Sequence, residues 1–282
     1  SFQQISERAE QTGIDAVVMT DYFQQKLSYG IFSYEKPSIL KRGIHSYFSQ
    51  IEEANRENED VILLAGAEPV PYYTWSGNLL SNNLTVHDLQ KNLIVWGLDE
   101  PALERLPSIE NKKSKLPKKL SGDQAYQKVI DYVRQHNGLV IWSTPDVAAN
   151  TRFRKGLIHF DTAPYPESIR RTTGYTGVAI FPEGKDATGS IGGYWDQMLS
   201  QYVRGKREEP VWAFAESVVH DKNISINFSQ WDNIVFAEAK SEPALLEAMK
   251  QGRFYIRTVI KGDLTVKRFE ASDSLSPQGA SG

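Results

Sequence analysis

The stretch AVVMTDYF, residues 16–23, joins a short apolar run to Thr-Asp and then to two aromatic residues. A continuous apolar run without alternation is typical of a strand that is buried on both faces, as in the parallel sheets of α/β proteins. In such folds, sites are built where the parallel strands reach their carboxyl ends. The stretch therefore predicts a buried strand whose end presents Asp21 and Tyr22 to a functional site.

Outward from this stretch, apolar runs alternate with segments of helical spacing. Strands are predicted at residues 14–19, 60–68, 92–98, 139–145, 177–184, 210–217 and 233–239. Helices are predicted at residues 2–12, 38–58, 122–138, 194–203 and 241–253, and a long loop at residues 99–121. This alternation predicts an α/β fold with a mostly parallel sheet, either a (β/α) barrel or a doubly wound sheet. No glycine-rich phosphate loop follows the first strand, which disfavours a dinucleotide-binding fold.

Composition excludes several classes of protein. The chain has 282 residues and a net charge of −3, so no strongly basic face is indicated and nucleic acid is not an expected partner. The basic cluster at residues 111–120 is expected to be a solvated loop. The absence of cysteine excludes disulfides and thiolate metal sites, and no apolar run approaches the ~20 residues of a membrane span. Composition does not decide between a cytoplasmic and an exported protein.

Polar residues fall where the predicted strands end. These residues are Asp21, Glu68, Ser143, Thr144, Glu183, Glu216 and His220. In a (β/α) barrel the strand ends converge on one face, and carboxylates beside an imidazole are typical ligands of zinc and other divalent metals. The pattern therefore indicates a functional face, although polar residues also follow strands that carry no site.

The order of motifs along most of the chain resembles the PHP superfamily, which is named after polymerase and histidinol phosphatase. The matching segments are GIDAVVMTD (13–21), LLAGAE (63–68), HNGLVIWSTP (136–145), VAIF (178–181), WDQML (195–199), VWAFAESVVH (211–220) and AMKQGRFY (248–255). The resemblance implies a distorted seven-stranded (β/α)7 barrel, formed here by residues 1–270, with a flexible tail at residues 271–282. It also implies phosphoester hydrolysis with two or three divalent metals, which activate a water and stabilise the charge of the phosphate.

The sequence departs from the family's metal ligands at several positions. The family's first strand carries His-x-His, and we expect that strand to lie upstream of Ser1, where the visible chain opens inside a helix. Tyr22 and Thr144 stand where the family has histidines, and Val218 stands where it has an aspartate. Tyrosine and threonine stay protonated at neutral pH and are poor metal ligands, and valine cannot bind a metal at all. Only Glu68 and His220 remain as ligands that the resemblance implies.

Three functions stay open from the sequence. The first is a PHP-like protein whose metal set is largely lost and which binds a small-molecule or phosphorylated ligand, with no metal or with a single zinc, manganese or iron ion. Its pocket would contain Asp21, Tyr22, Glu68, Thr144 and His220. The second is an active metal-dependent phosphoesterase, a hydrolase whose remaining ligands lie upstream of Ser1. The third is a sugar or polyol enzyme that uses two of Glu68, Glu183 and Glu216 as an acid/base pair. The resemblance also suggests a bacterial origin, while no protein partner is indicated.

Overall fold

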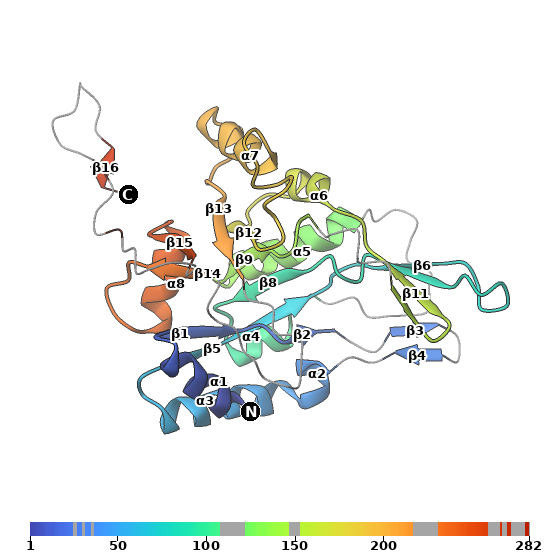
Figure 1. The fold of residues 1–282 in the computed structure, drawn as a ribbon, viewed down its shortest axis with the longest axis horizontal. Helices are drawn as coiled ribbons and strands as arrows, with labels where there is room; N and C mark the ends of the chain where they lie inside the picture. The colour runs from blue at the N-terminus through green and yellow to red at the C-terminus, as the bar shows by residue number, and fades with distance from the viewer. Residues whose placement is uncertain are drawn as a thin grey trace.

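The structure is a computed structural model that describes residues 1–24, 27–29, 32–34, 37–107, 122–146, 153–216, 231–258, 266, 270–271 and 280–281. A mixed seven-stranded sheet forms its centre (Figure 1). In spatial order the sheet contains β1 (Ala16–Met19), β5 (Ile62–Pro69), β8 (Leu93–Trp96), β9 (Leu139–Trp142), β12 (Gly177–Phe181) and β13 (Trp212–Ala215). The short strand β2 (Tyr22–Phe23) also pairs with the end of β5.

Strand β8 runs against the other strands of this sheet. The pairs β1–β5, β9–β12 and β12–β13 are parallel, whereas β8 is antiparallel to both β5 and β9. Residues 70–92, which join β5 to β8, contain strands and no helix, so the chain returns from the same edge that it left. The amino end of β8 therefore lies beside the carboxyl ends of its parallel neighbours.

The predicted α/β class is confirmed, but a closed (β/α)7 barrel is not. The sheet curls into a half-barrel that stays open, because β1 and β13 lie at its two ends and do not pair in the part of the chain that the structure describes. A closed barrel of parallel strands has a crossover helix after each strand. The connection between β5 and β8 lacks that helix, which is why the strand reverses and the barrel pattern is broken.

Alternate residues of each strand face two different cores. On β5, Leu63, Ala65 and Ala67 belong to the larger core, whereas Leu64 belongs to a smaller one. The helices on the larger core are α1 (Phe2–Gln11), α2 (Ile39–Arg42), α3 (Ile44–Glu57), α4 (Glu100–Glu104), α5 (Gly122–Gln135), α6 (Pro166–Arg171) and α7 (Tyr194–Val203). None of the described helices is long and apolar enough to cross a membrane.

The smaller core is covered by α8 (Glu242–Lys250) and the hairpin of β14 (Trp231–Val235) and β15 (Phe254–Thr258). The indole nitrogen of Trp96, at the end of β8, donates to Glu242 at 2.8 Å. That of Trp212, at the start of β13, donates to the Lys250 carbonyl at 2.9 Å. Helix α8 is thereby held at the amino ends of the parallel strands, which leaves their carboxyl ends on the opposite edge.

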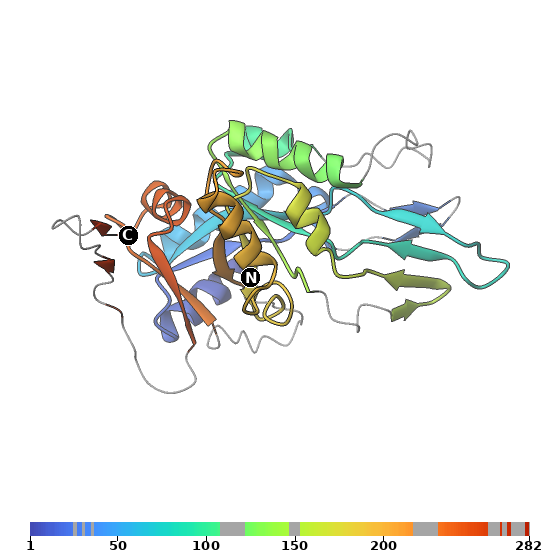
Figure 2. The ribbon, with the colours of Figure 1, turned by 90° about the horizontal axis from the view of Figure 1, so that it is seen from above.

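A second sheet of four strands projects from the main sheet as an arm (Figure 2). Its order is β10 (Phe153–Lys155), β11 (Ile158–Asp161), β7 (Thr85–His87) and β6 (Thr74–Ser76). A separate small core of Leu27, Tyr73, Val86, Leu89 and Phe160 lies at its base. The remaining strands are the hairpin of β3 (Leu27–Tyr29) with β4 (Phe32–Tyr34), and the pair β16 (Glu270–Ala271) with β17 (Ala280–Ser281).

Most predicted elements are present with shifted ends, and two predictions need correction. The helix expected over residues 38–58 is broken at Gly43, whose φ of 94° is in the left-handed region that glycine adopts readily. The loop expected at residues 99–121 contains α4, which Asp99 caps by accepting from the Ala102 amide at 2.8 Å. Residues 108–121 of that loop lie outside the described chain, as does the tail apart from β17 and Ala271.

Candidate functional site

The carboxyl end of β5 and the turn after β1 bring three predicted site residues together. Tyr22 lies opposite Glu68 in the parallel pairing of β2 with β5, and the Glu68 amide donates to the Asp21 carbonyl at 3.0 Å. Asp21 forms an ion pair with Arg42 of α2 at 3.0 Å. The structure therefore places Asp21, Tyr22 and Glu68 side by side at one edge of the sheet.

Asn92 joins this group, although no pattern in the sequence pointed to it. It precedes β8, and the reversed direction of β8 carries it to the edge where β5 ends. The Asn92 side-chain amide donates to the Glu68 carboxylate. Asn92 is only 4% exposed, and its Oδ1 atom is buried with no hydrogen-bond partner in the described part of the chain. A buried carbonyl oxygen without a donor is unfavourable, so this atom marks a place where a donor is missing.

A second carboxylate, Glu216, lies at the end of β13. Its Oε2 accepts from the Ser143 hydroxyl at 2.7 Å, and its Oε1 accepts from the Thr144 amide at 3.1 Å. Burial, with a smaller contribution from the nearby Glu183 carboxylate, outweighs the two hydrogen bonds and raises the pKa of Glu216 to about 7. Glu216 is thus a carboxyl group that is partly protonated at neutral pH.

Thr144 has an unusual backbone conformation. Its φ is +43°, a region that β-branched residues rarely adopt because of steric clash. Such conformations persist only where the surrounding structure enforces them, and they are concentrated at functional sites. Here the enforcing contacts are the bond from the Thr144 amide to Glu216 and the contact of the Thr144 hydroxyl with Tyr165 at 3.2 Å.

Tyr165 lies near both carboxylates. Its hydroxyl donates to the Ser143 carbonyl and also contacts Thr144. Burial raises the pKa of Tyr165 well above its usual value, and the charges of Glu216 and Glu68 act in the same direction. The hydroxyl therefore stays protonated, with carboxylates from both β5 and β13 in its surroundings. Sequence reasoning missed Tyr165 because it stands in an irregular segment before α6.

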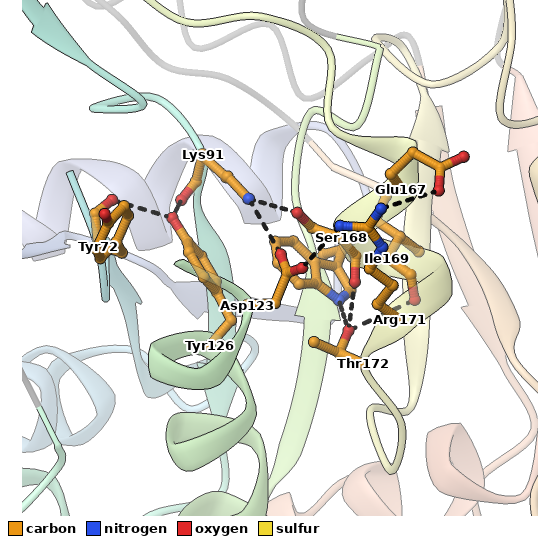
Figure 3. A network of polar contacts seen from close by, with 10 residues as sticks. Tyr72, Lys91, Asp123, Tyr126, Glu167, Ser168, Ile169, Arg171 and Thr172 are labelled. Atoms are coloured by element: carbon orange, nitrogen blue, oxygen red, sulfur yellow. Dashed lines mark hydrogen bonds and ion pairs between the residues drawn. The ribbon is translucent and has the colours of Figure 1, made fainter. Parts of the chain in front are cut away.

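Beneath this edge, Lys91 forms a buried polar network (Figure 3). Its ammonium group donates to Ser168 of α6 at 2.5 Å and lies 3.8 Å from Asp123 of α5. The rings of Tyr126, Trp142 and Tyr165 lie 4.7, 5.9 and 5.7 Å from the same nitrogen. Burial lowers the pKa of Lys91, while Asp88 and Asp123 oppose that shift. The Lys91 ammonium group is therefore bound by other groups of the protein and points away from solvent.

The described histidines lie away from the strand-end carboxylates. His45 of α3 contacts Glu100 at 3.1 Å, while His87 contacts Ser76 at 2.7 Å and His159 contacts the Asn82 carbonyl at 3.2 Å, both in the arm. His136 bonds to the Tyr132 carbonyl at 2.8 Å within α5 and the turn after it. His220, predicted as a metal ligand and pocket residue, lies outside the described residues.

The strand-end residues do not fit a bridged metal centre in the part of the chain that the structure describes. No three histidine, aspartate or glutamate side chains gather there in a way that could hold a metal. Asp21 is paired with Arg42, Glu68 with Asn92, and Glu216 with Ser143 and Thr144. A catalytic zinc normally needs about three protein ligands, so Glu68 would need partners from elsewhere in the protein.

Comparison with known proteins gives distant structural likenesses but no match in sequence. No protein-family model and no curated protein matches the sequence. Among solved structures, the chain is similar to a two-domain protein from Bacteroides vulgatus that contains a predicted PHP-like metal-dependent phosphoesterase, with a TM-score of 0.46 and 12% sequence identity. The match covers 90% of this chain and 59% of that chain, so this chain spans less than two thirds of that protein's length.

Proposed function

We propose that this chain is a PHP-like protein whose strand-end site binds a small polar ligand without a two- or three-metal centre. The observation that carries the proposal is the hydrogen bonding of Glu216. Its two carboxylate oxygens accept from Ser143 and from the Thr144 amide, at the position where the family supplies a histidine. The carboxylate is held by protein donors in a manner that suits a polar ligand site.

The other strand ends support the same interpretation. Asp21 is neutralised by Arg42 at 3.0 Å, and Glu68 accepts from Asn92. Tyr22 and Thr144 replace the imidazoles that the resemblance calls for, and neither is a good ligand for a divalent metal at neutral pH. The enforced conformation of Thr144 at +43° supports a functional role for this edge, since such conformations are retained at binding sites.

The test is the metal content and phosphatase activity of the full-length protein. We expect elemental analysis to find no more than one zinc, manganese or iron ion per chain. We also expect no turnover of 4-nitrophenyl phosphate, with or without added manganese. Two or more bound ions per chain, with turnover that Glu68→Gln abolishes, would overturn the proposal. Glu52→Gln, on the exposed side of α3, is the matched control.

A further inference from the structure

We infer that the ligand of the strand-end site is an uncharged molecule rich in hydroxyl groups, such as a sugar, cyclitol or smaller polyol, and not a phosphate ester. This inference rests on the proposed function, because it assumes that no metal cluster neutralises the carboxylates. It adds the chemical class of the ligand, which follows from the donors and acceptors that the site presents.

The first support is the missing donor at Asn92. The side chain is 4% exposed, its amide nitrogen is used by Glu68, and its Oδ1 has no partner among the described residues. An acceptor in this position is satisfied by a hydroxyl or another donor group. The phosphoryl oxygens of a phosphate monoester dianion only accept hydrogen bonds, so such a group placed against Asn92 leaves its Oδ1 unsatisfied.

The second support is the charge at this edge. Glu68, Glu183 and Glu216 all stand at strand ends, and the Glu183 carboxylate lies near enough to raise the pKa of Glu216. Like charges in a partly buried site repel strongly, so a phosphate dianion is disfavoured here unless cations compensate. A neutral polyol avoids this repulsion and donates to the same carboxylates.

The third support is that nearby cations are already used. Arg42 is bound to Asp21, and Lys91 is held by Ser168 and three aromatic rings. Protein sites for phosphate usually provide arginine forks, lysines or helix amino ends. Neither Arg42 nor Lys91 is available to a ligand without breaking an existing pairing.

The hydroxyl groups of the site also fit a polyol ligand. Ser143, Thr144 and Tyr165 form one connected group around Glu216. Because Glu216 is partly protonated at neutral pH, it can donate as well as accept. A polyol hydroxyl also donates and accepts hydrogen bonds. Glu216 and a ligand hydroxyl can therefore bond to each other without a net charge on the ligand.

The test is a panel of ligands added to the full-length protein in EDTA and, separately, in manganese. The probes are glycerol, erythritol, myo-inositol, glucose, glucose 6-phosphate and inorganic phosphate. Ligand-observed NMR reports weak binding, and titration calorimetry gives the affinity. We expect at least one neutral polyol to bind in EDTA, and glucose 6-phosphate to bind about tenfold or more weakly than glucose, which corresponds to about 1.4 kcal/mol.

Glu68→Gln and Glu52→Gln locate the binding. Glu68→Gln keeps the size of the side chain and removes the charge, and we expect it to weaken polyol binding about tenfold. Glu52→Gln, on the exposed side of α3, should leave binding unchanged. Circular dichroism confirms that both variants are folded, and the wild-type panel gives an answer even if one variant is unstable.

The outcomes separate this inference from the proposed function. Phosphate or glucose 6-phosphate binding in EDTA as tightly as glucose overturns the inference and leaves the metal-free site in place. Phosphate binding that requires two or more manganese ions per chain overturns the proposed function itself. A panel in which no neutral polyol binds also overturns the inference.

Discussion

At the scale of single residues, Glu216 gives the clearest pH prediction. Its pKa rises from 4.5 to about 7 in the folded protein, mainly because of burial. As the pH increases, the unfolded chain loses this proton first, so the contribution of Glu216 to stability falls between pH 4.5 and about 7 and is constant above that. At 1.36 kcal/mol per unit, the full effect is at most about 3.4 kcal/mol.

Glu216→Gln removes this titration. We expect the free energy of unfolding of the variant, relative to wild type, to rise by about 2–3 kcal/mol between pH 5 and pH 8. Urea unfolding at the two pH values measures the difference. Glu52→Gln provides the comparison, and we expect its difference from wild type to stay constant. An unchanged difference for Glu216→Gln would show that the carboxyl is already ionised at pH 5.

The sequence predicted which residues end the strands but not what they bond to. Asp21, Glu68, Thr144 and Glu216 could be placed because an apolar run followed by a polar residue marks a strand end. Asn92 could not, because its role depends on the reversed direction of β8, which is set by the 70–92 connection. Tyr165 was also missed, since a tyrosine in an irregular segment has no periodic pattern.

At the scale of elements, Lys91 joins β8 to α5 and α6. Its ammonium group contacts Ser168 and Asp123 and lies among three aromatic rings, and the side chain is 9% exposed. Lys91→Ala removes the cation, leaves a cavity between these elements and takes one partner from Asp123, which keeps Arg171 at 3.5 Å. We expect the free energy of unfolding to fall by about 2–4 kcal/mol.

Lys128→Ala is the matched control for this prediction, because Lys128 is exposed on α5. We expect that variant to stay within about 0.5 kcal/mol of wild type in urea unfolding. Equal effects of the two substitutions would mean that the Lys91 network contributes nothing specific to stability.

Helices and strands with strong periodicity were predictable, whereas the arm was not. The segments of α5 and α7 have regular apolar spacing, and their predicted spans match closely. Strands β6, β7, β10 and β11 have three or four residues each and pair across distant parts of the sequence. Such short strands are defined by their pairing and by the small core beneath them, which a local pattern does not contain.

At the scale of the whole molecule, the open half-barrel has two different edges. Helix α8 closes the amino-terminal edge through Trp96 and Trp212, while the carboxyl-terminal edge carries Glu68, Thr144 and Glu216. The motif order in the sequence led to the hypothesis that a site lies at this carboxyl-terminal edge. It did not predict that the sheet stays open, because strand direction depends on the connections rather than on the strands.

A bridged metal centre would connect several strand ends of this sheet, so its presence would be measurable in the stability of the whole molecule. Metal ions present at 100 times their dissociation constant add about 2.7 kcal/mol to the free energy of unfolding. For a chain of this size, that raises the melting temperature by roughly 5–10 °C.

We expect manganese, zinc and EDTA each to shift the melting temperature by less than about 2 °C. The reason is that Asp21, Glu68 and Glu216 are already held by Arg42, Asn92 and the Ser143–Thr144 pair. Thermal unfolding followed by circular dichroism measures the shift. A rise of 5 °C or more that disappears in Glu68→Gln, with two or more ions bound per chain, would place a bridged metal centre at this edge and contradict the proposed function.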